Sequence, residues 1–330
     1  MPDTEQEAPV RVVVTGAAGF IGSHVVDGLL ARGDQVVAID SFDPFYDPRI
    51  KRLNLAAAAR NPAFRLIEED IRNVEKLDAA LGDGPYDAII HLAAATGVRP
   101  SIADPLRYLR MNVEGTLGAI QLAERKQIGR LVFGSSSSVY GDSAPVPFVE
   151  SDPAATPISP YAATKRAGEL LCYTAHHLSG LSVMCMRLFT VYGPRQRPDL
   201  AIHKFVSMIE KGEPLTVYGD GQSRRDYTHV TDIVAGIASA LRFMADKPVF
   251  ETVNLGGGQP VTVIELIRSI ERHLGKEASI EWLPAQEGDV RQTFASIEKA
   301  ARLLDFKPGM GLDGGLQGFV EWYRSGTVNA

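Results

Sequence analysis

The sequence predicts an α/β protein built on a doubly wound parallel sheet, with a smaller α/β part towards the C-terminus. Short apolar runs rich in β-branched residues alternate with helical stretches over the first two-thirds of the chain, and small or polar motif residues follow the ends of these runs. Apolar strands of this kind are typical of parallel sheets, whose two faces are both covered by helices. We expect residues 1–188 to form the sheet domain and residues 189–330 to form mainly the substrate-binding part, interleaved with the first.

The first predicted strand, residues 10–14, runs directly into the glycine-rich turn Thr15-Gly16-Ala17-Ala18-Gly19-Phe20-Ile21-Gly22. A helix is predicted over residues 20–32, because apolar side chains recur there at helical spacing. Strand, glycine turn and helix together are the context in which such a turn binds a dinucleotide. The glycines let the backbone approach a pyrophosphate closely, and the helix N-terminus supplies N–H donors and partial positive charge.

The second predicted strand, residues 35–39, ends in Asp40. An acidic residue at this place is expected to meet the adenosine ribose of the dinucleotide. It favours NAD over NADP, because the 2′-phosphate of NADP would face like charge. The sheet domain is therefore predicted to bind NAD.

The rest of the sheet domain continues the alternation. Further strands are predicted at residues 64–67, 88–90, 131–133 and 182–188, and further helices at residues 74–81, 106–126 and 161–178. Ligands on such a sheet gather beyond the carboxyl ends of the strands. The motif residues at these ends, which we expect to line the site, are Asp70 and Ile71, the run from His91 to Ala95, and the run from Ser135 to Ser138.

Tyr161 and Lys165 lie four residues apart, on one face of the helix predicted over residues 161–178. We expect the ammonium of Lys165 to lie beside the phenol of Tyr161 and to favour its ionised form, because a nearby opposite charge stabilises the charged state. An unperturbed tyrosine has a pKa of about 10, so it needs such help to act as a base near neutral pH. The spacing alone is a weak signal, but together with the glycine turn and the serine run it predicts a catalytic tyrosine.

The composition excludes several classes of function. The net charge of −6 gives no general attraction to nucleic acid. Cys172 and Cys185 form no disulfide framework, and no histidine has metal-ligand spacing, so we expect no metal site. No apolar run approaches the roughly 20 residues that cross a bilayer, and residues 1–9 are polar without a signal-peptide core. The expectation is a cytoplasmic enzyme that binds neither membrane nor nucleic acid.

Five motifs occur in the order found in extended short-chain dehydrogenase/reductases, and over residues 10–304 the chain resembles the nucleotide-sugar epimerases of that family. The motifs are the glycine turn, His91-Leu92-Ala93-Ala94, the run from Ser135 to Gly141, Tyr161-x-x-x-Lys165, and Arg225-Asp226-Tyr227. The branch that it most resembles is the UDP-glucuronate 4-epimerases. The stretches that carry this resemblance are residues 45–49, 97–101 and 189–199.

The resemblance implies a Rossmann fold and 4-epimerisation of a UDP-sugar, with UDP-glucuronate and UDP-galacturonate as the favoured pair and a 4-keto sugar as intermediate. Tyr161 would take the proton of the sugar 4-hydroxyl while the C4 hydride passes to bound NAD⁺, which later returns it. Lys165 would hold the nicotinamide ribose, and Ser136, or its neighbours Ser137 and Ser138, would contact the sugar O4. The implied cofactor-binding residues are Gly16, Gly19, Phe20, Ile21, Gly22, Asp40, Asp70, Ile71, Leu92, Ala93, Ala94, Asn112, Ser135, Tyr161 and Lys165.

The serine run favours an epimerase over related enzymes. At this position the motif of sugar 4,6-dehydratases is similar to Thr-Asp-Glu-Val-Tyr-Gly. That of the decarboxylases that form UDP-xylose is similar to Ser-Glu-Val-Tyr-Gly. This chain has Ser137 and Ser138 in place of the acidic residues. Those enzymes use the carboxylate after oxidation, but epimerisation ends when the hydride returns. A UDP-glucose or UDP-N-acetylglucosamine 4-epimerase remains the main alternative. A UDP-glucuronate decarboxylase and a non-catalytic NAD-binding protein are further alternatives.

Arginines are expected to capture the substrate, since guanidinium groups suit diphosphates and carboxylates. Arg225 matches the family's phosphate-binding arginine, and Arg291 resembles a second one. Arg197 is the first choice as partner of a sugar carboxylate, and Arg99 is the second. The implied substrate-binding set is completed by Thr96, Ser136, Ser137, Ser138, Thr190 and, as a uracil pocket, Phe205, Val217 and Tyr218. As in its relatives, the chain is expected to form a homodimer through the helices at residues 106–126 and 161–178.

Overall fold

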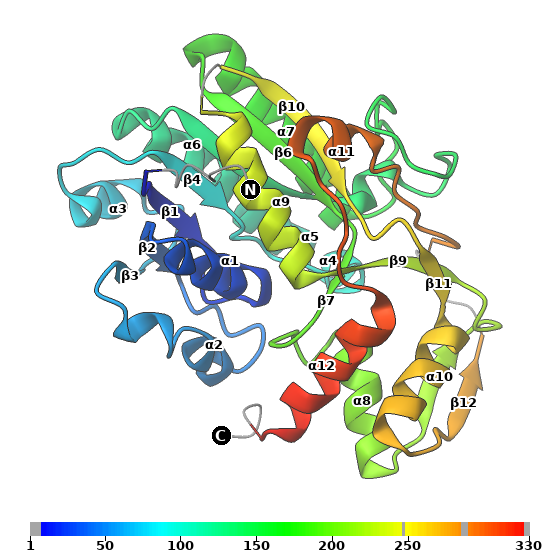
Figure 1. Ribbon diagram of the computed structural model, residues 1–330. Helices are drawn as coiled ribbons and strands as arrows, with labels where there is room; N and C mark the ends of the chain where they lie inside the picture. Colours follow the sequence, from blue (N-terminus) through cyan, green and yellow to red (C-terminus); the bar gives the residue numbers. More distant parts are fainter. Residues whose placement is uncertain (1–7, 246–247, 285–289, 327–330) are drawn as a thin grey trace, which may run out of the picture.

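The computed structural model describes residues 8–245, 248–284 and 290–326, and its centre is a seven-stranded parallel sheet (Figure 1). The strands lie in the order β10-β6-β5-β4-β1-β2-β3, so the chain winds outwards in both directions from β1. They are β1 (Arg11–Thr15), β2 (Gln35–Asp40), β3 (Phe64–Glu68), β4 (Ala88–His91), β5 (Arg130–Ser136), β6 (Ser182–Leu188) and β10 (Phe250–Leu255). The predicted doubly wound fold class is confirmed.

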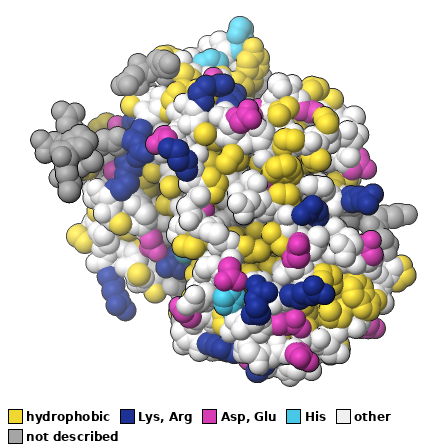
Figure 2. Space-filling view, turned by 45° about the vertical axis from the view of Figure 1, so that its right-hand side comes forward, with side chains coloured by type: hydrophobic (Ala, Val, Ile, Leu, Met, Phe, Trp, Pro, Cys, Tyr) yellow, Lys and Arg dark blue, Asp and Glu magenta, His cyan; other side chains and the backbone are white. Residues whose placement is uncertain are grey.

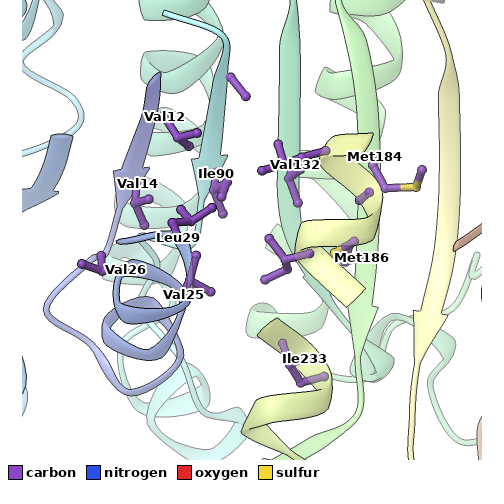
Figure 3. Packing of buried hydrophobic residues seen from close by; sticks show 14 of the residues in the cluster. Val12, Val14, Val25, Val26, Leu29, Ile90, Val132, Met184, Met186 and Ile233 are labelled. Atoms are coloured by element: carbon purple, nitrogen blue, oxygen red, sulfur yellow. The ribbon is translucent and has the colours of Figure 1, made fainter. Parts of the chain in front are cut away.

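Helices cover both faces of this sheet. On one face lie α1 (Phe20–Ala31), α9 (Val230–Phe243) and α11 (Glu298–Leu304), and on the other lie α3 (Val74–Leu81), α6 (Gly115–Arg125) and α7 (Pro160–Ser179). Val12 and Val14 of β1 belong to the core on the α1 side, as Figure 3 shows, whereas Val13 belongs to the core on the other side. Side chains alternate along a strand, so β1 is apolar throughout because both of its faces are buried.

The smaller part carries two minor sheets and a third core. Strands β7 (Thr190–Tyr192), β9 (Arg224–His229) and β11 (Pro260–Thr262) form one sheet, and β8 (Leu215–Tyr218) pairs with β12 (Ile280–Leu283). Helices α8 (Ala201–Lys211), α10 (Val263–Leu274) and α12 (Leu312–Arg324) pack around the third core, in the lower right of Figure 1.

The two parts exchange chain, so residue 188 is not a boundary in space. Strand β10 pairs with β6 at the edge of the large sheet, with Phe250 opposite Val183, and α9 lies beside α1 (Figure 1). Polar residues interrupt β10, which reads Phe-Glu-Thr-Val-Asn-Leu. An edge strand needs less apolar surface than a central one. The sequence pattern of β10 therefore did not predict a strand.

The helix predicted over residues 106–126 is divided into three pieces. A short helix, α5 (Pro105–Tyr108), continues into a π-helical segment, Leu109–Glu114, before α6 begins. Such segments are often found at functional sites. Two further short helices are α2 (Pro48–Asn54) and α4 (Val98–Ala103).

Candidate active site

A cavity of about 480 Å³ lies at the carboxyl ends of the large sheet, where the smaller part meets it. The predicted cofactor-binding residues that line it are Gly16, Gly19, Phe20, Ile21, Gly22, Asp40, Asp70, Ile71, Leu92, Ala93, Ala94, Ser135, Tyr161 and Lys165. The predicted substrate-binding residues that line it are Thr96, Ser136, Thr190, Arg197 and Arg225. One cavity therefore brings together residues from both predicted sets.

The glycine turn forms a cradle of bare backbone. Gly16 has a φ of +68°, and a Cβ atom there would lie 2.6 Å from the Ala93 nitrogen. A Cβ on Gly22 would lie 2.1 Å from the Gly16 carbonyl oxygen. Helix α1 begins at Phe20 with Gly19 as its N-cap, so no side chain caps its first N–H groups. Close backbone and uncapped donors fit the pyrophosphate of a dinucleotide.

Asp40 is buried at the end of β2 with its carboxylate facing the cavity. One oxygen accepts the Ala18 N–H at 2.9 Å, and the other accepts the Phe42 N–H at 2.8 Å. These bonds orient the carboxylate, and each oxygen keeps a further lone pair for a ligand hydroxyl. This geometry fits the ribose of NAD.

Asn112 lies in the π-helical segment and fastens the loop after β4 to helix α7. Its amide oxygen accepts the Ala95 N–H at 2.7 Å, and its amide nitrogen donates to the Ala95 carbonyl at 3.0 Å and to the Thr164 hydroxyl at 2.9 Å. Asn112 itself lies behind the cavity wall. Direct contact of Asn112 with the cofactor stays a prediction.

Helix α7 places Tyr161 and Lys165 in the cavity wall. Its N-terminus is set by Ser159, whose hydroxyl caps the Ala162 N–H at 3.1 Å, and by Pro160 in the first turn. Lys165 is buried, and its ammonium donates to the Gly134 carbonyl at 2.6 Å. Burial lowers the pKa of Lys165 to about 8.

The surroundings of Tyr161 shift its pKa in both directions. Burial raises the pKa of Tyr161, while a hydrogen bond with Ser136 and the positive charge of Arg197 act to lower it. The ammonium of Lys165 is directed to the Gly134 carbonyl, and the expectation that it also lowers the pKa of Tyr161 stays a prediction.

Ser136 is the serine of the run whose side chain meets Tyr161. It is buried, lines the cavity and donates to the Ser138 hydroxyl at 3.1 Å. Ser137 and Ser138 begin the turn Ser137–Tyr140 and lie outside the cavity lining. Ser135 lines the cavity, but its hydroxyl donates to Glu169 at 2.6 Å.

Several predicted substrate-binding residues lie away from the cavity lining. Phe205 and Val217 are buried in the third core. The guanidinium of Arg99 lies over the ring of Tyr218 at 5.0 Å. Arg291 is exposed, and its carbonyl accepts the Arg224 N–H at 3.0 Å. The binding roles of these residues stay predictions.

Arg197 lies in the loop between β7 and α8 and is held in a fixed pose. Its guanidinium forms a two-pronged ion pair with Asp199, at 2.9 and 2.8 Å, and lies 5.4 Å from the ring of Phe45.

Four further residues that line the cavity were not predicted from the sequence, namely Asp43, Tyr46, Lys51 and Gln196. Tyr46 and Gln196 fall in stretches that carry the resemblance to the glucuronate branch, which was the available signal.

The described part of the chain offers no group of three or more His, Cys, Asp or Glu side chains that could hold a metal ion. Among its helices, none is long and apolar enough to span a membrane. On the face drawn in Figure 2, positive and negative side chains are interspersed. That face therefore shows no continuous basic stripe.

The sequence pattern of the NAD dependent epimerase/dehydratase family matches residues 12–256. The chain belongs to this family. A UDP-glucuronate 4-epimerase from Thermodesulfobacterium geofontis is 40% identical over 314 residues, which cover 94% of this chain and 95% of that relative.

Solved structures of other family members share the whole fold. The UDP-glucuronic acid 4-epimerase from Bacillus cereus, in complex with UDP-glucuronic acid and NAD, has a TM-score of 0.88 and 34% identity, over 96% of this chain and 99% of that one. The UDP-N-acetylglucosamine 4-epimerase from Methanobrevibacter ruminantium M1, in complex with UDP-N-acetylmuramic acid, has a TM-score of 0.85 and 31% identity, over 97% and 99%.

Proposed function

We propose that this family member is an NAD-dependent UDP-sugar 4-epimerase that interconverts UDP-glucuronate and UDP-galacturonate. The observation that carries the proposal is a single cavity lined by the glycine cradle, Tyr161 and Lys165, and the arginines Arg197 and Arg225. The full-length similarity to a UDP-glucuronate 4-epimerase supports it.

In this proposal Tyr161 is the base at the sugar 4-hydroxyl. Ser136, already hydrogen-bonded to Tyr161, positions the sugar O4 and shares the proton. The positive charge of Arg197 favours the phenolate against the effect of burial. NAD⁺, when bound, takes up the hydride from C4 and returns it to the opposite face of the 4-keto sugar. Lys165, held by the Gly134 carbonyl, binds the nicotinamide ribose.

The side chains around Tyr161 favour epimerisation over elimination or decarboxylation. Among the residues that the structure describes, the acidic side chains lining the cavity are Asp40, Asp43, Glu69 and Asp70, at or just beyond the ends of β2 and β3. Tyr161 lies on α7, beside the hydroxyl of Ser136. Elimination or decarboxylation after oxidation would need a second acid or base, and no carboxylate is described beside Tyr161 for that role.

The charge of Arg197 supports an acidic sugar. Its side chain is 13% exposed, and burying a sugar carboxylate without a partner would be costly. The guanidinium has five N–H donors, of which Asp199 uses two, so donors remain for a substrate oxygen. Arg225 lines the same cavity and is the proposed partner of the diphosphate.

The substrate proposal is tested by offering the purified protein UDP-glucuronate, UDP-galacturonate, UDP-glucose and UDP-N-acetylglucosamine and separating the products. We expect interconversion of the two uronates and poor turnover of the neutral sugars. Arg197→Ala should weaken the base for all four sugars, because its charge favours the phenolate. For the uronates it should also cost about 2–5 kcal/mol more in transition-state binding, the value of a buried charge pair. Arg225→Ala should weaken all four substrates alike. Efficient epimerisation of UDP-glucose by the unmodified protein would overturn the choice of sugar.

We further infer a homodimer. Large apolar side chains are exposed along the helical stretch from α5 to α6 and on α7, namely Leu106, Leu109, Leu117, Leu170 and Tyr173. Exposed apolar side chains clustered on two neighbouring helices are typical of a protein–protein contact. A second copy of the chain, presenting the same two helices, would cover them in a four-helix contact.

A further inference from the structure

The segment of residues 43–51, which we name the strap, lines the cofactor cavity with side chains that belong to none of the five motifs. Asp43, Tyr46 and Lys51 face the cavity. The ammonium of Lys51 is buried, donates to the Asp43 carbonyl at 2.9 Å and lies 5.0 Å from the ring of Tyr46. The strap is therefore folded upon itself instead of extending into solvent.

Two contacts fasten the strap to the sheet domain. The carboxylate of Asp43 accepts a hydrogen bond from the Arg107 guanidinium at 2.6 Å, which ties the start of the strap to α5. The strap runs into α2, where the side chain of Asn54 donates to the Ala18 carbonyl of the glycine turn at 3.0 Å. Both ends of the strap are thus anchored beside the cofactor cradle.

A third contact joins the strap to the loop that carries Arg197. The Phe45 ring lies 5.4 Å from the guanidinium carbon of Arg197. Phe45 is 42% exposed, so the contact lies at the rim of the cavity. The loop itself is held on α1, since His24 bonds the Pro194 carbonyl at 2.9 Å and Arg195 pairs with Asp27 at 2.7 Å. The Phe45–Arg197 contact therefore bridges two anchored loops.

We propose that the strap retains NAD between turnovers, with Phe45 on Arg197 as the clasp and the Asp43–Arg107 pair as the anchor. The inference rests on the proposed function, in which each cycle ends with NAD in the form in which it began. Such an enzyme has no need to exchange its cofactor, unlike an oxidoreductase that releases it after each reaction. A strap fixed at both ends beside the cofactor cradle suits an enzyme of that kind.

The test measures release of NAD in the absence of any sugar. Phe45→Ala and Arg107→Ala remove the clasp and the anchor, and Arg49→Ala is the matched control on the same segment, because its side chain is 86% exposed and pairs with Asp47. We expect the first two variants to lose bound NAD about three- to tenfold faster than the unmodified protein during a chase with excess unlabelled NAD, the scale of one exposed cation–π contact or ion pair. Arg49→Ala should match the unmodified protein.

Phe45→Trp provides a rescue, because tryptophan presents the strongest aromatic face to a cation and should keep NAD release slow. Unchanged release in both Phe45→Ala and Arg107→Ala would overturn the proposal. So would equal acceleration by Arg49→Ala, which would indicate general loosening of the segment. A raised KM for the UDP-sugar with unchanged NAD release would assign the strap to sugar entry instead. Failure of the proposed reaction would appear separately, as normal NAD retention without turnover of any UDP-sugar.

Discussion

The surroundings of Tyr161 shift the pKa of its phenol in opposite directions. Removal of the phenol from water raises its pKa, whereas Ser136 and Arg197 favour the phenolate. Arg197 comes from a loop that follows β7, some distance along the chain from α7. The acidity of the proposed base is therefore controlled across two parts of the fold.

The first prediction concerns Tyr161→Phe. Removing the hydroxyl should lower kcat by about 10²–10⁴-fold, the usual contribution of general acid–base catalysis, and leave NAD content nearly unchanged. Steady-state kinetics with UDP-glucuronate and the absorbance of released cofactor would measure both quantities. A variant that keeps more than about a hundredth of the activity would remove Tyr161 from the role of base.

His91 is a buried residue that holds the cavity wall together. The Thr116 hydroxyl donates to the Asn112 carbonyl at 2.6 Å, so it accepts from the imidazole Nε2–H at a longer 3.5 Å. The imidazole Nδ1 then accepts from the Thr15 hydroxyl at 2.7 Å, and Thr15 accepts the Ala93 N–H at 3.3 Å. This chain of bonds requires a neutral imidazole, and burial lowers the pKa of His91 to about 3.

The second prediction follows from that lowered pKa. Because unfolded histidine takes up a proton near pH 6.5 and the folded one only near 3, this contribution to stability is complete above pH 6.5 and declines as the pH falls towards 3. Between pH 7 and pH 5 the loss should be about 2 kcal/mol, at about 1.4 kcal/mol per pH unit below 6.5. Urea unfolding measures the free energy of unfolding of the unmodified protein and of His91→Asn at each pH. The variant should lack the part of the pH dependence that comes from His91. A free-energy difference between the two proteins that stays constant with pH would contradict it.

At the scale of elements, helix α7 is fastened to the sheet by a buried ion pair. Glu169 lies one turn beyond Lys165 on α7 and pairs with Arg187 of β6 through two contacts of 2.9 Å. Both side chains are buried, and Glu169 also accepts the Ser135 hydroxyl of β5. One carboxylate therefore ties the helix that carries Tyr161 to two strands.

The third prediction tests this attachment. Glu169→Gln leaves the buried Arg187 without its ion-pair partner and should reduce the free energy of unfolding by about 3–5 kcal/mol. Arg187→Met should cost less, because Glu169 keeps Arg166 at 3.0 Å and the Ser135 hydroxyl at 2.6 Å. The double variant Glu169→Leu/Arg187→Met replaces the pair with apolar side chains and should recover most of that loss. Urea unfolding at fixed NAD concentration measures all three proteins. Single variants that cost under about 1 kcal/mol would place the attachment of α7 elsewhere, in its apolar packing.

At the scale of the whole molecule, the exposed apolar side chains on α6 and α7 bear on its assembly. The fourth prediction is that Leu170→Asp/Tyr173→Asp shifts the protein from dimer to monomer, because two charges would be buried without partners in the contact. Light scattering after size-exclusion chromatography at micromolar concentration reads the mass. Met310→Asp changes an apolar side chain that is similarly exposed outside these helices, and it should leave the dimer intact. A monomeric unmodified protein would refute the assembly.

The sequence alone determined the order of most strands and helices in the sheet domain. β1, β2 and β6 are apolar on both faces because the sheet is covered on both sides, and this pattern is readable without a structure. The sequence also located the glycine turn, because only glycine tolerates the close approach of positions 16 and 22 to neighbouring backbone. Tyr161 and Lys165 were visible because their spacing is local to one helix.

Only the tertiary structure decided which distant residues meet. β10 joins the large sheet, Arg197 acts on Tyr161, and Phe45 contacts Arg197 across the cavity rim. Such contacts depend on how loops after different strands converge. The periodicity of apolar residues predicts helices and strands but does not predict which loops meet. The direction in which the Lys165 ammonium points was decided in the same way, by the nearby Gly134 carbonyl of β5. Local pattern thus specifies elements and their apolar faces, whereas the electrostatics of the site arise from groups that folding alone brings together.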